Sequence, residues 1–257
     1  MNKLIAVIYG VVVYGFFGLT WAYFIGFLGD VAVPKSIDSG DVAPLPETLA
    51  IDIALLALFF THHSLMARAR AKLAIARFVP QAIERSTYVL IASLAMVLLM
   101  AMWRPLPQVV WQASGALRVM ALVVFWAGVV VSLAASNAID GLALFGVRQV
   151  LAHFRGRVLP NVPFRTPGLY RLVRHPMMTG MLMTFWAWPT MTQGRLLLAA
   201  AMSGYILAAV KWLEERDLRK AFGTQYARYE REVPMLLPLK VRRPPASNEE
   251  LRTTHQP

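Results

Sequence analysis

Long stretches of uncharged, mostly apolar residues alternate with short polar connections along this chain. Four of these stretches approach the length that a helix needs to cross a bilayer, about 20 residues: 4–28, 48–67, 86–103 and 119–139. Only Asp52 interrupts them with a charge. We therefore expect four full transmembrane spans.

Two shorter apolar pieces follow Arg174, at 175–194 and 196–210, and Arg195 separates them. This pattern predicts a helical hairpin. Beyond it, 213–231 carries its apolar side chains on a single stripe, which predicts an amphipathic cytoplasmic helix that Gly223 interrupts. The fold class that we expect is all-α: a polytopic helical membrane protein with four spans, a C-terminal hairpin and this amphipathic helix.

Three regions follow from this pattern. Residues 1–140 hold the N-terminal transmembrane helices, and 141–240 hold the hairpin and most polar side chains within apolar surroundings. Residues 241–257 form a polar tail that we expect to be disordered. The first apolar stretch predicts a retained span rather than a signal peptide, because it is long, follows a single positive residue and lacks a clear small-residue cleavage site.

Composition supports lipid as the main solvent. Hydrophobic residues make up 57% of the 257 residues and charged residues 16%, against roughly a quarter charged in soluble domains. The chain has no cysteine, which excludes disulfides, thiolate metal ligands and a cysteine nucleophile. Any sulfur chemistry must therefore use sulfur from a substrate or cofactor.

The net charge of +12 is distributed unevenly. If all six apolar segments cross, only four of the 26 Lys and Arg residues lie on one side: Lys35, Arg104, Arg118 and Arg195. The positive-inside rule then places both termini in the cytoplasm. Basic charge here indicates topology and contact with the lipid bilayer rather than with nucleic acid, and no obligate protein partner is evident.

Arg174, His175 and Pro176 open the hairpin. Proline suits the first turn of a helix, so Arg174 and His175 would lie at its cytoplasmic mouth, beside backbone N–H groups that favour an anion. The alternative is an interfacial anchor with a snorkelling arginine.

Glu214 and Glu215 follow the hairpin directly. Adjacent helical residues point in different directions, so one carboxylate is expected to accept hydrogen bonds from a ribose while the other pairs with an arginine; a solvated helix start is the alternative. His62 and His63 diverge for the same reason, and no metal site is expected. Asp52 must be buried or near the outer interface.

Several motifs in order resemble one membrane enzyme family: "GLYRLVRHPMMTG", "EERDL" and "FGTQYARYEREVPMLLP". They are similar to the C-terminal region of the isoprenylcysteine carboxyl methyltransferase-like membrane methyltransferases. The resemblance to the methanethiol S-methyltransferase branch extends upstream through "HHSLMARAR", "SNAIDGLALFGVRQV" and "TFWAWPTMT". It covers roughly 61–238.

The resemblance implies a helical bundle that holds S-adenosyl-L-methionine at the cytoplasmic face and methylates a small volatile thiol. The residues expected to bind the cofactor are Gln149, His153, Gly168, Leu169, Tyr170, Arg174, His175, Tyr205, Glu214 and Glu215. The chain departs from the broader family at Met178, where a tyrosine is common. This departure puts a prenylcysteine substrate in doubt and suits a smaller acceptor.

The expected reaction is attack of methanethiolate on the methyl group, giving dimethyl sulfide. The candidate bases are His63, His153 and His175, because the thiolate is the nucleophile. His175, Arg174 and His63 are the expected catalytic residues, and Arg148 is a second candidate for holding an anion. Methylation of another small thiol, a lipid amine or an isoprenoid stays open, as does a non-catalytic NnrU-like membrane protein.

Overall fold

A computed structural model describes residues 2–66, 77–159 and 163–239. The polar tail and part of the connection after residue 66 lie outside these ranges. The helices are α1 (Lys3–Gly29), α2 (Leu45–Met66), α4 (Glu84–Met102), α5 (Gly115–Ala138), α6 (Gly141–Leu144), α7 (Val147–Arg155), α8 (Pro176–Trp186), α9 (Gln193–Ala209), α10 (Glu215–Phe222) and α11 (Thr224–Glu232). Short 3-10 turns, η1 (Gln81–Ile83) and η2 (Gly168–Arg171), precede α4 and α8.

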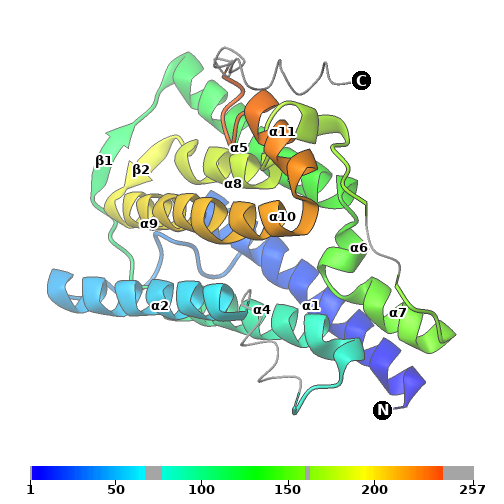
Figure 1. Cartoon of the computed structure of the whole chain (residues 1–257). Coiled ribbons are helices and arrows are strands. Elements are labelled where there is room, and N and C mark those ends of the chain that lie inside the picture. Colours follow the sequence, from blue (N-terminus) through cyan, green and yellow to red (C-terminus); the bar gives the residue numbers. More distant parts are fainter. Residues whose placement is uncertain (1, 67–76, 160–162, 240–257) are drawn as a thin grey trace, which may run out of the picture.

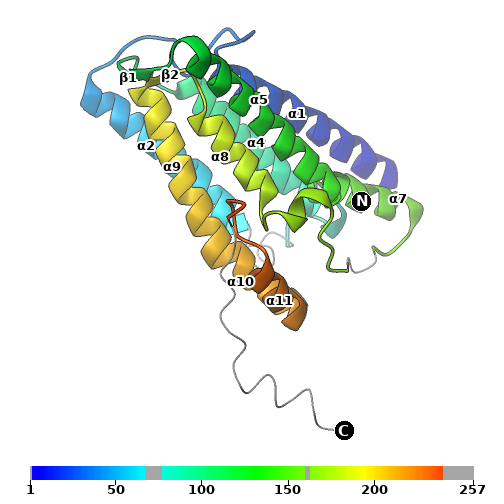
Figure 2. The same ribbon diagram turned by 90° about the horizontal axis from the view of Figure 1, so that it is seen from above.

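The long helices run side by side in a bundle (Figure 1, Figure 2). Two strands lie at one end, which we call the strand end (Figure 2). The opposite end, which we call the cytoplasmic-type end for its basic residues, holds α7, α10, α11 and the N-terminus (Figure 2). Five helical segments are long and apolar enough to cross a membrane: Lys3–Gly29, Leu45–Leu65, Gln81–Met102, Gly115–Ala138 and Gln193–Phe222. The chain is thus an all-α integral membrane protein, as its hydrophobic pattern predicted.

The two arms of the predicted hairpin differ in length. The helix α8 has 11 residues, about 16 Å at 1.5 Å per residue, which is too short to cross a hydrocarbon core of about 30 Å. The helix α9 instead continues through the segment η3 (Val210–Glu214) into α10. Because α8 is the shorter arm, its start lies beside the continuous segment α9–η3–α10 at a point before that segment ends.

A short antiparallel strand pair was not predicted. Strand β1 (Val109–Gln112) pairs with β2 (Thr190–Thr192), with Val109 opposite Thr192. Both strands lie in connections that follow a helix, and β-branched residues favour extended backbone there. The pair joins the loop after α4 to the loop between α8 and α9.

Glycines bring α5 and α8 into close contact, as is common between membrane helices. A Cβ on Gly180 would lie 2.5 Å from the Gly128 carbonyl oxygen and 2.7 Å from the Ser132 backbone nitrogen. Ser132 also donates a hydrogen bond across this contact to the Met177 carbonyl (3.1 Å). The position of α8 therefore depends on small residues.

We expect Gly180→Ala to destabilise the protein by about 1–3 kcal/mol, because the added methyl forces two backbones apart. Gly204→Ala is the matched control, since a Cβ at Gly204 in α9 meets nothing within 4 Å and alanine favours a helix. The apparent melting temperature in detergent measures both. Equal melting temperatures would show that the α5–α8 contact relaxes freely.

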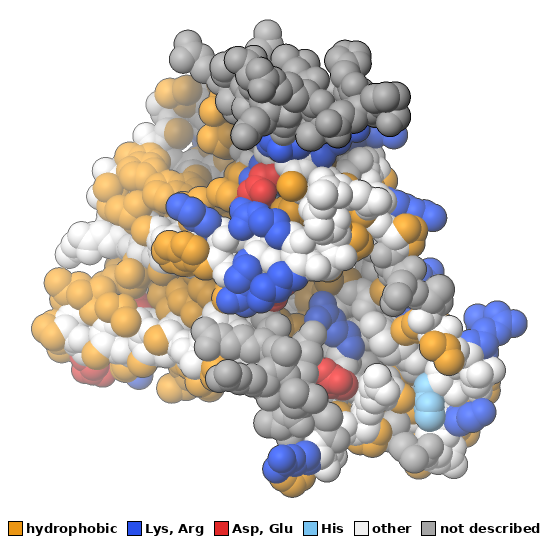
Figure 3. Space-filling model, viewed as in Figure 1, with side chains coloured by type: hydrophobic (Ala, Val, Ile, Leu, Met, Phe, Trp, Pro, Cys, Tyr) orange, Lys and Arg blue, Asp and Glu red, His pale blue; other side chains and the backbone are white. Residues whose placement is uncertain are grey.

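The surface divides along the bundle. Figure 3 shows hydrophobic side chains gathered over α2, α9 and the strand end, while Lys and Arg gather over α10, α11 and α7. Many large apolar side chains on α1 and α5 are exposed on the surface of the protein, as is expected of helices that face lipid. The one carboxylate inside a predicted span, Asp52, is fully buried and accepts a hydrogen bond from the Arg104 backbone N–H (2.9 Å).

Candidate functional site

The start of α8 is the centre of a buried polar cluster. Pro176 is the first residue of α8 and His175 is its N-cap, because proline has no N–H to leave unpaired there. The backbone N–H groups of Arg174 and His175 donate to the carbonyls of Pro234 (2.9 Å) and Met235 (3.1 Å). These two N–H groups are therefore occupied by the C-terminal segment rather than free for an anion.

Arg174 forms a buried ion pair with Glu215. Its Nε and Nη2 atoms lie 2.8 Å and 2.6 Å from Glu215 Oε1, and both side chains are almost fully buried. Nη1 donates to the carbonyl oxygens of Glu230 (3.0 Å) and Val233 (2.6 Å). One side chain thus ties the start of α8 to α10 and to the end of α11.

His175 lies between two carboxylates. Its Nε2 is 3.2 Å from Glu215 Oε1 and its Nδ1 is 3.5 Å from Glu214 Oε2. Burial favours the neutral ring, but hydrogen bonds to Glu214 and Glu215 and their charges outweigh it and raise the pKa of His175 to about 9. The ring is therefore a cation at neutral pH, and in this arrangement neither nitrogen is free to accept a proton.

A π-helical segment explains how neighbouring glutamates reach one histidine. Residues Val210–Glu214 form this wider turn between α9 and α10, and π turns are frequent at functional sites. Glu215 is buried in the ion pair, whereas the Glu214 side chain is 48% exposed. Glu215 thus pairs with an arginine, as expected of one of the two carboxylates, whereas Glu214 reaches His175 and stays half-exposed.

The charge of His175 makes stability depend on pH. A pKa raised from 6.5 to about 9 adds about 3 kcal/mol to the free energy of unfolding, fully present below pH 6.5 and lost as pH rises through 9. We expect the wild type to melt above His175→Gln at pH 6 and to lose that advantage by pH 10. Parallel melting curves from pH 6 to pH 10 would contradict a charged His175.

The loop before α8 adds Gly168, Leu169 and Tyr170 to the cluster. Gly168 has φ +51°, a conformation that glycine adopts easily. Tyr229 on α11 donates a hydrogen bond to the Tyr170 carbonyl (2.5 Å). Burial raises the pKa of the Tyr170 hydroxyl, and the negative charge of Glu214 raises it further. The loop is therefore joined to α11 through Tyr229 and lies within electrostatic reach of Glu214.

A second group of polar side chains surrounds His63 near the end of α2. The Tyr88 hydroxyl on α4 lies 2.9 Å from His63 Nδ1, and the Tyr205 ring on α9 meets His63 edge-on with centroids 6.1 Å apart. Tyr205 also shares a hydrogen bond with Ser64 (3.1 Å). The charge of Glu214 also acts on His63, so Glu214 lies within electrostatic reach of both histidines.

The structure does not bring every predicted site residue to these groups. Gln149 and His153 lie on α7, which packs against α1 and η1 and is distant from α10 and α11 (Figure 1). The Gln149 amide nitrogen donates to the Ala143 carbonyl (3.0 Å). Arg148 forms an ion pair with Asp140. The amphipathic face of α7 explains this position, because it covers apolar residues of α1 such as Gly10.

Two tyrosines have site positions that sequence reasoning missed. Tyr226 on α11 is 1% exposed, and its hydroxyl has no hydrogen-bond partner in the described ranges. The charges of Glu215 and Arg174 act on this hydroxyl. Tyr226 lies within the amphipathic segment 213–231, and Tyr88 lies within the apolar stretch 86–103. Nothing in their spacing distinguishes them from packing residues.

Comparisons with known proteins agree on one family. The model of the NnrU protein family matches residues 52–240. The chain is 45% identical to Methanethiol S-methyltransferase 2 of Bradyrhizobium diazoefficiens, over 92% of this chain and 91% of that protein. It is 45% identical to Methanethiol S-methyltransferase of Mycobacterium tuberculosis, over 93% of this chain and 98% of that protein.

A more distant relative is human Nurim, 33% identical over 66% of this chain and 68% of that protein. No solved structure matches the chain. The bacterial relatives match almost the whole chain, 92% and 93% of its length. The chain therefore belongs to the NnrU protein family, in the group that contains the bacterial methanethiol S-methyltransferases.

Proposed function

We propose that this protein transfers a methyl group from S-adenosylmethionine to methanethiol and releases dimethyl sulfide. The observation that carries the proposal is the buried Arg174–His175–Glu215 cluster with the open carboxylate of Glu214, in a chain so similar to methanethiol S-methyltransferases. The reaction takes place at the cytoplasmic face of a bacterial inner membrane, where both termini lie. The basic residues at that end of the bundle support this orientation.

The side chains near α8 fit this cofactor. Glu214 offers a half-exposed carboxylate, which suits the hydroxyls of a ribose. The buried Tyr226 hydroxyl has no partner in the described chain, and a buried donor without a partner is costly unless a ligand or water fills it. Glu214, Tyr226 and the Gly168–Tyr170 loop would therefore hold the cofactor, with Arg174, His175 and Glu215 fixing their positions.

The cofactor supplies an electrophilic methyl group on a positively charged sulfur. The protein must then provide a thiolate and exclude water. Attack of a thiolate on a sulfonium removes charge, so a site that desolvates both lowers the barrier. The apolar residues around the cluster would exclude water from the reacting groups. Met178, which packs against the core, adds an apolar side chain where the broader family commonly has a tyrosine hydroxyl.

His63 is the base in our proposal. His175 is already protonated, and α7 holds His153 elsewhere. The ring of His63 is half-buried and oriented by Tyr88 (2.9 Å). His63 accepts the S–H proton and leaves methanethiolate, whose sulfur would take the methyl group that the bound cofactor supplies, with S-adenosylhomocysteine as the leaving group.

The test uses the full chain, purified and reconstituted in lipid vesicles. We expect dimethyl sulfide in the headspace when S-adenosylmethionine and methanethiol are present, and lower activity with larger acceptors such as a prenylcysteine or an isoprenoid thiol. Glu214→Gln should weaken binding of S-adenosylhomocysteine and reduce turnover, and it should lower the melting temperature less than loss of the buried Glu215 does, because Glu214 supplies only part of the charge that stabilises protonated His175. The control Asp217→Asn alters an exposed carboxylate on the next turn.

The outcomes separate the remaining classes. Binding of S-adenosylhomocysteine without thiol methylation would indicate a methyltransferase for another acceptor, such as a lipid amine. No binding at all would indicate a non-catalytic membrane protein. Either result would refute the proposed function.

A further inference from the structure

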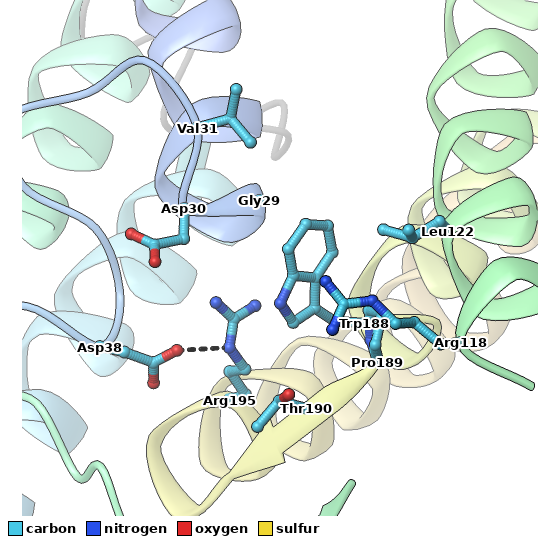
Figure 4. A pocket seen from close by; sticks show the side chains of 10 residues that line it. All are labelled: Gly29, Asp30, Val31, Asp38, Arg118, Leu122, Trp188, Pro189, Thr190 and Arg195. Carbon is cyan, nitrogen blue, oxygen red and sulfur yellow. Dashed lines mark hydrogen bonds and ion pairs between the residues drawn. The ribbon is translucent and has the colours of Figure 1, made fainter. Parts of the chain in front are cut away.

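An open cavity of about 460 Å³ lies at the strand end of the bundle, opposite the His175 cluster. This volume falls within the range of small-ligand pockets, about 300–1,000 Å³. Its walls come from the end of α1, the start of α5, and the loop and strand before α9. Figure 4 shows its charged side chains, two of each sign: Asp30, Asp38, Arg118 and Arg195.

Arg195 forms a fixed floor for this cavity. The residue is 5% exposed, and its Nε donates to Asp38 Oδ2 (2.6 Å). Its Nη1 donates to the Leu28 carbonyl, and the guanidinium lies 5.1 Å from the centre of the Trp188 ring, within cation–π range. Arg195 and Asp38 therefore neutralise each other and hold the wall in place.

Asp30 and Arg118 are the remaining charges. Figure 4 shows them on either side of Arg195 and Trp188. Within the described ranges, neither side chain makes a hydrogen bond or an ion pair with the protein. Asp30 also acts electrostatically on Arg195, whose own ion pair is with Asp38. The cavity thus presents one carboxylate and one guanidinium without an ion-pair partner in the described ranges, and together they complement a ligand that carries both charges.

The position of the cavity indicates a lipid ligand. The predicted span α1 ends at the rim of the cavity, and the predicted span α5 begins there. The cavity therefore lies where the hydrocarbon core meets the polar head groups. Trp188 in its wall is typical of that level. Around Arg118 and farther along α5, the surface carries exposed apolar side chains: Leu117, Val119, Met120 and Val123. Acyl chains can lie along this surface.

We propose that the cavity binds the head group of a phospholipid with a primary ammonium group, such as phosphatidylethanolamine. The phosphate pairs with Arg118 and the ammonium with Asp30, while the acyl chains lie on α5. A phosphatidylcholine head group has no N–H to donate to Asp30, and phosphatidylglycerol has no ammonium. This binding site goes beyond the methyl transfer and does not depend on it.

The experiment measures lipid retention by the full-length protein. The detergent-purified protein is exchanged with vesicles of phosphatidylethanolamine, phosphatidylcholine or phosphatidylglycerol of equal chain length, and bound lipid is counted by native mass spectrometry. We expect a preference of about fivefold for phosphatidylethanolamine over phosphatidylcholine, from roughly one interfacial charge contact. Asp30→Asn should remove this preference, and Arg118→Gln should weaken retention of all three lipids.

Asp41→Asn is the matched control, because Asp41 is an exposed carboxylate in the same connection after α1 but not in the cavity wall. It should keep the wild-type preference. Asparagine tolerates the left-handed backbone of Asp30 (φ +49°), and unchanged methyl transfer verifies that each variant is folded.

Two results would overturn the proposal. The first is equal retention of phosphatidylethanolamine and phosphatidylcholine by the wild type, or an unchanged preference in Asp30→Asn. The second is displacement of the bound lipid by soluble glycerophosphoethanolamine at equal concentration, which would show that the cavity binds a free head group rather than a lipid.

Discussion

Replacing His63 with glutamine is expected to lower kcat for methanethiol by about 10²–10⁴-fold at pH 7, the usual contribution of a general base. Glutamine keeps a polar group beside Tyr88 but cannot accept the thiol proton. Because a growing fraction of the thiol is ionised at higher pH, the loss should shrink as pH rises. Initial rates of dimethyl sulfide formation from pH 6 to pH 10 measure this.

His62→Gln is the matched control from the same turn of α2. Its ring stacks on Tyr88, with centroids 5.8 Å apart, but adjacent helical side chains point in different directions. We expect kcat of His62→Gln to stay within a few-fold of the wild type. A His63→Gln loss that is uniform across pH would mean that His63 only positions the substrate, and an unchanged kcat would remove it from the mechanism.

Glu215→Ala is expected to destabilise the protein by about 3–5 kcal/mol, because it leaves the buried Arg174 guanidinium without its counter-charge. Glu215 Oε1 accepts hydrogen bonds from Arg174 Nε (2.8 Å) and His175 Nε2 (3.2 Å), so both cations lose a partner. The start of α8 should then separate from α10. The apparent melting temperature in detergent and the loss of thiol methylation measure this effect.

Glu232→Ala is the control for that prediction. Glu232 pairs with Arg228 one turn earlier on α11 (2.9 Å), and both side chains are exposed; exposed pairs contribute little to stability. This variant should melt close to the wild type and remain active. If Glu215→Ala melted as Glu232→Ala does, the buried pair would not hold the site together.

The hydrophobic pattern was sufficient for the fold because lipid selects for span length and apolar composition. It predicted the helical class, the break at Gly223 and Pro176 as a helix start, all of which the structure contains. The strand pair was missed, because it forms between connections far apart in sequence. The short α8 was also not foreseen, since apolar residues continue past Trp186 in a non-helical loop.

The candidate site was only partly accessible to sequence reasoning. Motifs pointed to Arg174, His175 and the two glutamates, and the structure brings these four together. Their division of roles depends on the π turn before Glu215, which has no sequence signal. Gln149 and His153 were grouped with them by motif order alone, whereas packing of α7 on α1 holds them elsewhere.

The most direct measurement of the central claim follows one labelled methyl group. The protein in vesicles is supplied with S-adenosylmethionine carrying a trideuterated methyl group and with unlabelled methanethiol, and the headspace and lipids are analysed by mass spectrometry. Our account predicts dimethyl sulfide with a single trideuterated methyl, formed in equal amount with S-adenosylhomocysteine. Labelled lipid, or no labelled product, would contradict it.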